Sequence, residues 1–179
     1  MSKFYVIGTP IGNLEDITFR AVAILSSVDL ILCEDTRVTA RLLERYTIST
    51  SMMSFHARSK LQKVENIISL LESGKTVALV SDAGTPTISD PGALLVSKIR
   101  QALPTLEIIS IPGPSAVTAA LSIAGVPASD FLFLGFLPHK KGRETLFSEI
   151  AASKRTVVFY ESPHRILRTL ESLDKRLDA

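Results

Sequence analysis

Residues 4–28, FYVIGTPIGNLEDITFRAVAILSSV, decide the fold of this chain. The apolar run FYVI is followed by the loop GTPIGNLED and then by apolar residues at helical spacing. An apolar strand that passes through a short Gly/Pro loop into an amphipathic helix is typical of the units that build parallel sheets. We expect Asp16 to cap the helix, because its carboxylate can accept hydrogen bonds from the first N–H groups.

The same strand–helix unit recurs along the next 80 or so residues, as expected of a repeated βα pattern. Strands are expected at 29–34, 51–55, 76–82 and 106–112, and helices at 35–46, 60–74 and 91–103. We expect Gly74 to close the second of these helices and Pro91 to open the third. Strands that are apolar along their whole length, alternating with helices, predict an α/β fold: a parallel five-stranded sheet flanked by helices on both faces.

A second, smaller α/β region follows this sheet. After a helix that begins near residue 116, VPASD (126–130) resembles a linker, with strands expected at 131–136 and 156–162 and helices at 142–153 and 163–177. We therefore divide the chain into an N-terminal domain, 1–124, and part of a second α/β domain, 125–179. Two strands and two helices bury only a modest core, so we expect this second domain to be truncated.

The composition is that of a globular protein of the cytoplasm. With 46% hydrophobic residues in 179, the chain can bury a sizeable core. Its apolar runs are far shorter than the ~20 residues that span a bilayer, and no charged and then apolar leader follows Met1. The single cysteine, Cys33, excludes an internal disulfide. No Cys/His cluster has the spacing of a zinc site, so we expect no metal.

Positive charge gathers in one late segment. The net charge is only +2, but residues 139–168 carry 7 basic and 3 acidic side chains, whereas residues 1–138 carry 11 and 12. This segment is the candidate phosphate contact of a nucleic-acid partner, and the alternative is a solvated face without a ligand. The candidate RNA-binding residues are Lys140, Lys141, Arg143 and Arg165.

Four loops carry the residues from which a ligand site could be built. Ligands of open parallel sheets bind at the carboxyl ends of the strands. The loops that follow the strands are GTPIGNL (8–14), EDTR (34–37), SDAGTPTISDPG (81–92) and PGPSA (112–116). The first is not the GxGxxG fingerprint, and Pro10 lacks the N–H that a phosphate would use. Four such loops at one edge favour a ligand site over a set of plain turns.

The loops EDTR and PGPSA offer polar groups at helix starts. Asp35 can cap its helix while Glu34 pairs with Arg37, or the two carboxylates can supply a general base. The Ser115 hydroxyl and neighbouring N–H groups can hold a carboxylate or a ribose.

Several motifs together carry a family resemblance. In chain order they are GTPIGNLEDIT, CEDTR, SDAGTPTISDPG, IPGPSA, GFLPHKKGR and FYESPHR. They resemble the ribosomal RNA small-subunit methyltransferase I family, a branch of the tetrapyrrole methylase superfamily. The resemblance implies an S-adenosylmethionine-dependent enzyme that methylates the ribose 2′-hydroxyl of a cytidine in the decoding region of 16S ribosomal RNA. It further implies two α/β domains with the cofactor between them, and a homodimer.

The resemblance also assigns roles to individual residues. Those implied to bind the cofactor are Pro10, Asp82, Gly84, Thr85, Ser115, Ala116, Tyr160 and Glu161. We expect Glu34 or Asp35, oriented by Arg37, to take the proton of the ribose hydroxyl. The rival functions are C-methylation of a corrinoid or other tetrapyrrole, and a non-catalytic module that binds RNA or a nucleotide.

Overall fold

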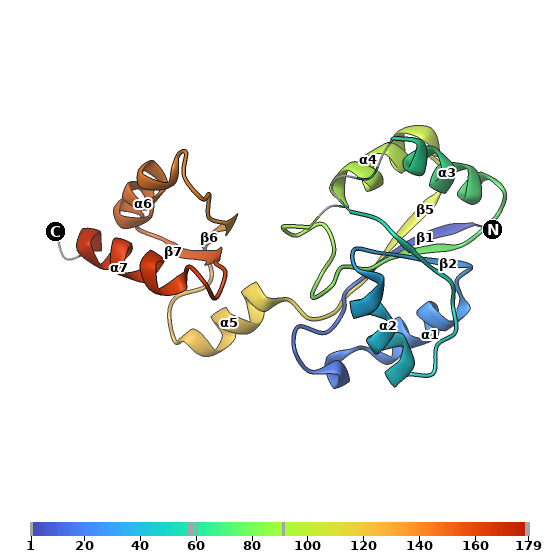
Figure 1. Cartoon of the computed structure of the whole chain (residues 1–179), viewed down its shortest axis with the longest axis horizontal. Coiled ribbons are helices and arrows are strands. Elements are labelled where there is room, and N and C mark those ends of the chain that lie inside the picture. Colours follow the sequence, from blue (N-terminus) through green and yellow to red (C-terminus); the bar gives the residue numbers. More distant parts are fainter. Residues whose placement is uncertain (1, 57–58, 60, 91, 178–179) are drawn as a thin grey trace. The chain divides into compact units, whose positions relative to one another are not determined.

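Five parallel strands form the sheet of the N-terminal part (Figure 1). The structure is a computed structural model that describes residues 2–56, 59, 61–90 and 92–177. The strands are β1 (Lys3–Ile7), β2 (Leu30–Cys33), β3 (Met52–Ser54), β4 (Val77–Leu79) and β5 (Glu107–Ile111), in the spatial order β3-β2-β4-β1-β5. The predicted α/β fold with a parallel five-stranded sheet is confirmed.

Helices cover both faces of this sheet. The helices α1 (Phe19–Ser27) and α2 (Thr36–Arg45) lie on one face, and α3 (Leu61–Glu72) and α4 (Ala93–Ala102) lie on the other (Figure 1). The sheet serves both layers because its side chains alternate: Ile31 and Cys33 pack with the first pair of helices, and Leu32 packs with the second. Buried apolar surface on both sides explains why the strands are apolar throughout.

The helix ends match the sequence predictions in part. Gly74 ends α3 with a φ of +94°, as expected of a helix-closing glycine. Asp16 does not cap α1. It lies in a short 3₁₀ helix, η1 (Leu14–Asp16), and Thr18 caps α1 instead by accepting a hydrogen bond from the Ala21 N–H at 3.1 Å. The helix α4 follows Gly92, and the predicted opening residue, Pro91, lies outside the described residues.

The loops after β1 and β5 touch through their backbones. The Gly8 N–H donates to the Ile111 carbonyl at 3.1 Å. A Cβ added to Gly8 would lie 2.8 Å from the Gly113 Cα, and one added to Gly113 would lie 2.8 Å from the Gly8 carbonyl oxygen. Each side of this contact therefore requires a residue without a side chain.

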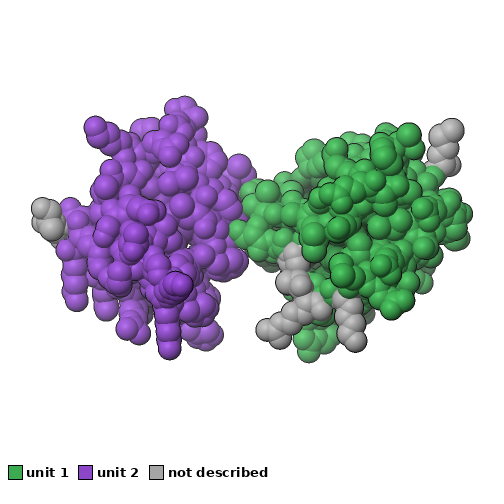
Figure 2. Space-filling model, turned by 90° about the horizontal axis from the view of Figure 1, so that it is seen from above, with its two compact units in different colours: residues 1–116 green, residues 117–179 purple. Residues whose placement is uncertain are grey.

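The chain divides into two units, Met1–Ala116 and Val117–Ala179 (Figure 2). The second unit pairs β6 (Phe131–Phe136) with β7 (Thr156–Tyr160) in parallel and packs α6 (Arg143–Ala152) against α7 (Ile166–Leu177). Almost all of α5 (Ala116–Ala124) falls in this unit, whereas the sequence prediction assigned it to the first domain. Among the described residues, no helix is both long and apolar enough to cross a membrane.

A buried carboxylate organises the second unit. Glu161 follows β7, and only 1% of its side chain is exposed. It accepts hydrogen bonds from the Ser162 N–H at 2.9 Å, from Thr169 Oγ1 at 2.8 Å and from Arg143 at 3.2 Å, and it pairs with Arg165. Burial raises the pKa of Glu161, but these hydrogen bonds and the arginine charges outweigh burial, so the pKa lies below its ordinary value.

The two arginines that pair with Glu161 also donate hydrogen bonds to the loop that follows β6. Arg143 also donates to the Pro138 carbonyl at 2.9 Å, and Arg165 also donates to the Leu137 carbonyl at 3.2 Å. Glu161 thus fixes the path of residues 137–143 through its two partners.

We expect Gly8→Ala and Gly113→Ala each to lower the free energy of unfolding by about 1–3 kcal/mol, because the new methyl group would overlap backbone. Urea unfolding followed by circular dichroism measures the change. Gly12→Ala is the matched control: nothing lies within 4 Å of its added Cβ, so its effect should stay within about 0.5 kcal/mol. Equal losses in the glycine-contact variants and the control would contradict the close approach.

We expect Glu161→Gln to destabilise the second unit by about 3 kcal/mol, near the lower end for breaking a buried ion pair, because two arginines lose their countercharge. Hydrogen exchange should increase over residues 137–143. Glu144→Gln is the control, since Glu144 is 72% exposed where it pairs with Arg176, and exposed pairs contribute about 0–1 kcal/mol. Unchanged exchange in Glu161→Gln would show that the loop does not depend on this carboxylate.

Candidate active site

Hydrogen bonds join the loops at the carboxyl ends of β1, β4 and β5. Thr9 and Gly84 exchange two backbone hydrogen bonds, of 2.9 and 3.0 Å, and the buried Thr9 hydroxyl donates to the Ser81 carbonyl at 3.1 Å. Thr85 Oγ1 donates to the Pro114 carbonyl at 3.3 Å. These contacts hold the predicted cofactor residues of the first unit at one edge of the sheet; they are Pro10, Asp82, Gly84, Thr85, Ser115 and Ala116.

A further hydrogen bond connects the loops after β2 and β4. The Asp35 N–H donates to Asp82 Oδ1 at 2.9 Å. The β4 loop therefore contacts the loops of β1, β2 and β5. The strand order explains this, because β4 lies between β1 and β2 and its chain turns toward α4, whereas theirs turn toward α1 and α2. Diverging connections of this kind open the crevice in which ligands of parallel sheets bind.

The two adjacent carboxylates of EDTR have different environments. Asp35 caps α2 by accepting from the Arg37 N–H at 2.9 Å, and it also accepts from Arg37 Nε at 3.0 Å and Nη2 at 2.6 Å. The Arg37 side chain and backbone hydrogen bonds lower the pKa of Asp35 to about 2. The predicted cap is confirmed, because Asp35 caps α2. The predicted pair of Glu34 with Arg37 is wrong, because the partner of Arg37 is Asp35.

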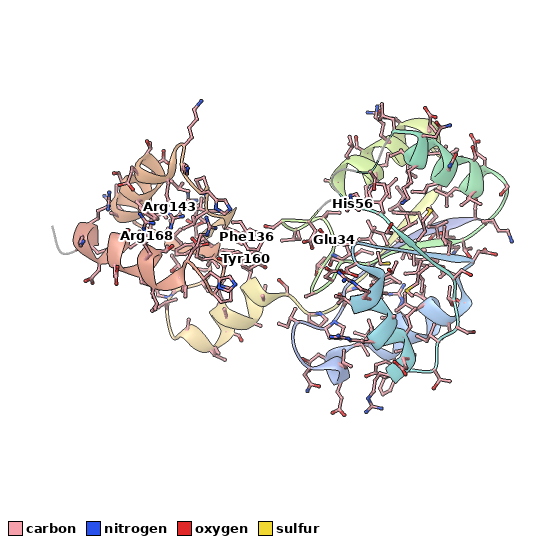
Figure 3. All side chains as sticks on the ribbon, in the orientation of Figure 1. Glu34, His56, Phe136, Arg143, Tyr160 and Arg168 are labelled. Atoms are coloured by element: carbon pink, nitrogen blue, oxygen red, sulfur yellow. The ribbon has the colours of Figure 1, made fainter. Side chains whose placement is uncertain are left out.

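Glu34 is perturbed in the opposite direction. Its pKa is raised first by burial and then by the negative charges of Asp82 and Asp90, while His56 lowers it. Figure 3 shows Glu34 and His56 at the same end of the sheet. Of the adjacent carboxylates Glu34 and Asp35, Glu34 therefore has the greater affinity for a proton.

Asp90 and His56 were missed as site residues from the sequence. Glu34, Ser81 and Asp90 line a common small cavity of about 10 Å³. Burial, followed by the charge of Asp82, raises the pKa of Asp90, and a hydrogen bond with Ser81 partly offsets this. In the sequence, Asp90 stands directly before Pro91, the residue expected to open the next helix. The sequence feature that could have indicated a role for Asp90 is its position in the same loop as Asp82.

The β4 loop contains a strained backbone. Thr87 has a φ of +75° and Ser89 a φ of +67°. A β-branched residue such as threonine rarely adopts this conformation, and such strain clusters at ligand sites and switches. A hollow of about 530 Å³ borders this strained segment on the side of α4 and is lined by Thr85, Thr87 and Arg100 among others. Another, of about 620 Å³, lies around Lys3 and Glu107, at the opposite edge of the sheet, away from the four loops.

The predicted site residues of the second unit have separate environments. Tyr160 contacts the rings of Phe133 and Phe136 at centroid distances of 5.1 and 5.2 Å. The Glu161 carboxylate is enclosed by its own hydrogen-bond partners and is not presented to a ligand.

The predicted RNA-binding residues fall into two groups. Lys140 and Lys141 are exposed. Arg143 and Arg165 are only 14% and 22% exposed, and both pair with Glu161. Their guanidinium groups organise the loop after β6, which argues against the phosphate contacts predicted for them. Among the described residues, no group of three or more His, Cys, Asp or Glu side chains could hold a metal ion.

The sequence relatives are ribosomal RNA methyltransferases. Residues 3–179 match the family Tetrapyrrole (Corrin/Porphyrin) Methylases. The ribosomal RNA small subunit methyltransferase I of Thermotoga maritima is 48% identical over 97% of this chain and 77% of its own length. Those of Vibrio cholerae and Escherichia coli O157:H7 are 50% and 46% identical over 94% and 96% of this chain.

Solved structures of tetrapyrrole enzymes share the fold. The cobalamin biosynthetic enzyme cobalt precorrin-4 methyltransferase superposes with a TM-score of 0.71 at 17% identity, covering 97% of this chain and 74% of that one. Uroporphyrin-III C-methyltransferase of Thermus thermophilus has a TM-score of 0.62 at 19% identity, covering 98% and 72%. At such identities the likeness concerns the fold alone.

The match extends over nearly all of this chain but only part of some relatives. The chain spans 58% of the Vibrio cholerae protein and 59% of the Escherichia coli protein. Three observations indicate the same family: the motifs noted in the sequence, the parallel sheet with its joined loops, and the identity of 46–50% to these relatives. The chain belongs to the ribosomal RNA small subunit methyltransferase I group of the tetrapyrrole methylase family.

Proposed function

We propose that this protein transfers a methyl group from S-adenosylmethionine to ribosomal RNA of the small ribosomal subunit. The observation that carries the proposal is its 46–50% identity to methyltransferases of that name, against 17–19% to the two structurally similar tetrapyrrole enzymes. The basic segment supports an RNA substrate, because lysines that neutralise phosphates contribute much of the affinity for nucleic acids.

The finer proposal follows the family resemblance. The acceptor is the 2′-hydroxyl of a cytidine in the decoding region of 16S ribosomal RNA. The protein acts in the cytoplasm and as a homodimer. A rigid set of loops is needed for this chemistry, because methyl transfer requires the hydroxyl oxygen, the methyl carbon and the sulfonium sulfur to lie in line.

The joined loops suit the proposed cofactor chemically. The exposed Asp82 carboxylate can accept hydrogen bonds from hydroxyl or ammonium groups, and the half-buried Ala116 offers apolar surface, whereas Pro10 is buried behind the loop surface. Gly84 keeps the β4 loop at a φ of +81° while its backbone bonds to Thr9. When bound, S-adenosylmethionine supplies an electrophilic methyl group on a positively charged sulfur.

The geometry favours Glu34 over Asp35 as the proton acceptor. In the transfer, the carbon–sulfur bond breaks, an oxygen–carbon bond forms and the hydroxyl proton leaves. Asp35 is committed to the α2 cap and to Arg37, and its low pKa makes it a poor base. The pKa of Glu34 is raised by burial and by the charges of Asp82 and Asp90, which is the direction that favours proton acceptance, and Asp35 with Arg37 positions the loop.

We expect Glu34→Gln to stabilise the protein at neutral pH. Because the pKa of Glu34 is raised on folding, its contribution to stability is greatest below its ordinary pKa and is lost as the pH rises through the raised value. A glutamine loses nothing over that range. The unfolding free energy of Glu34→Gln minus that of the wild type should therefore grow from pH 4 to pH 7 in urea titrations.

Asp35→Ala is the opposite control. The pKa of Asp35 falls from 3.8 to about 2 on folding, so its contribution is present above the higher value and is lost as the pH falls toward the lower one. This variant should be less stable than the wild type at pH 7, with the deficit shrinking below pH 4. A destabilised Glu34→Gln at pH 7 would show that Glu34 has a structural role instead.

We expect Glu34→Gln to slow methyl transfer by about 10²–10⁴-fold, the usual contribution of a general base, with unchanged cofactor affinity. Small subunits from a strain lacking the enzyme, incubated with labelled S-adenosylmethionine, provide the assay, and mapping of the modified nucleotide identifies the acceptor. Asp35→Asn is the control, because asparagine caps helices as well as aspartate does.

Three results would contradict the proposals separately. A near-normal rate in Glu34→Gln would remove Glu34 from the chemistry. Methylation of a tetrapyrrole rather than of small subunits would favour the corrinoid alternative. No binding of S-adenosylmethionine in calorimetric titration would favour a non-catalytic RNA-binding module.

A further inference from the structure

The aromatic side chains of the second unit gather on one face of the β6–β7 pair. The register of the two strands shifts by one residue between the pairs Phe133–Val158 and Phe136–Tyr160. Gly135 lies within this bulge and has a φ of +62°. An extra residue reverses the alternation of side chains, so Phe136 lies on the same face as Phe133, and the ring of Tyr160 contacts both.

The opposite face of the strand pair forms the core. Phe159, which precedes Tyr160 and so points the other way, packs with the buried cluster of Leu137, Phe147 and Leu173 under α6 and α7. Phe136 is not part of that cluster and is 59% exposed. Its ring is tilted by 54° against that of Tyr160, which supports it from one side (Figure 3). A large apolar ring is therefore held in a defined position with much of its surface in solvent.

The chain next to this ring is basic. The segment after Phe136 reads LPHKKGR, and the segment that follows Glu161 reads SPHRILR; neither contains an acidic residue. Lys140 and Lys141 are exposed, while the loop that carries them is fixed to Glu161 through Arg143 and Arg165. A fixed aromatic ring beside exposed lysines is the combination that binds single-stranded nucleic acid, in which bases stack and phosphates pair with cations.

We propose that Phe136, supported by Tyr160, is a stacking platform for an unpaired base of the RNA substrate, and that Lys140 and Lys141 hold the adjoining phosphates. This inference rests on the proposed RNA methyltransferase function. Charge favours RNA as the occupant over a protein surface, because two acid-free segments flank the ring. The adenine of the cofactor has the same stacking chemistry as an RNA base. The experiment therefore measures RNA binding and cofactor binding separately.

The test uses a single-stranded oligoribonucleotide carrying 2-aminopurine, whose fluorescence is quenched when it stacks. We expect Phe136→Leu to raise the dissociation constant by about 5- to 100-fold and to remove the quenching, since one stacked base contributes that much. Phe136→Trp should retain both. Because Phe136 is outside the core cluster, the melting temperatures of these variants should equal that of the wild type.

Two control variants separate stacking from charge. Phe19→Leu removes an aromatic ring that is 98% exposed in the first unit and should change neither affinity nor quenching. The double variant Lys140→Ala/Lys141→Ala should flatten the dependence of log K on log salt by about 1.4, or about 0.7 for each lost phosphate contact. Phe136→Leu should leave this slope unchanged.

The outcomes distinguish the platform from the underlying function. If the wild type methylates small subunits and Phe136→Leu binds the oligonucleotide as tightly as the wild type does, the platform is overturned and the function stands. If Phe136→Leu weakens S-adenosylmethionine binding instead, the ring belongs to the cofactor site and the platform is again overturned. A wild type that neither methylates subunits nor binds the oligonucleotide overturns both. Raised dissociation and Michaelis constants for RNA, with unchanged cofactor affinity, support the platform.

Discussion

The backbone contact between Gly8 and Gly113 is the constraint on which the candidate site depends. It allows the chain to leave β1 and β5 at nearly the same point, with no side chain between the two loops. The loop after β4 then bonds to these two loops. Gly84 bonds to Thr9 in the loop after β1, and Thr85 bonds to the loop after β5. Loops are usually the mobile parts of a parallel sheet. Here three of them are fixed to one another, so groups placed on them keep the mutual geometry that orientation-dependent chemistry needs.

Within these joined loops, Asp35 and Arg37 have structural roles, whereas their neighbour Glu34 is the proposed proton acceptor. Asp35 and Arg37 satisfy each other and the first turn of α2, which leaves Glu34 beside like charges and partly buried. An arrangement that optimised stability alone would not place Glu34, Asp82 and Asp90 together. Natural proteins accept such costs where a perturbed pKa serves a function. The strained backbone at Thr87, in the same loop as two of these carboxylates, is a second cost of the same kind.

The sequence predicts the elements of this fold well because each is encoded locally. Apolar runs bounded by Gly and Pro located the strands, and Gly74 ended its helix as expected. What the sequence did not predict was which partner each polar side chain would take. Asp16 had the right chemistry for a cap, but the extra turn of η1 moved that role to Thr18. The phosphate contacts of Arg143 and Arg165 stay a prediction; what the sequence did not indicate is that both guanidinium groups pair with Glu161, which lies four residues before Arg165 and 18 after Arg143.

The second unit repeats the logic of the first with different residues. In both, a group that follows a strand is enclosed by partners and fixes a loop: the glycine contact does so beside β1, and Glu161 does so beside β7. In both, exposed residues on the fixed loops are the proposed ligand contacts: Asp82 for the cofactor in one unit, and Phe136 with Lys140 for RNA in the other. A buried anchor restricts the loop before any ligand arrives, so less ordering entropy is lost on binding. In the proposed RNA platform, the buried Glu161 therefore acts by positioning the loop after β6 through Arg143 and Arg165, and not by contact with the RNA.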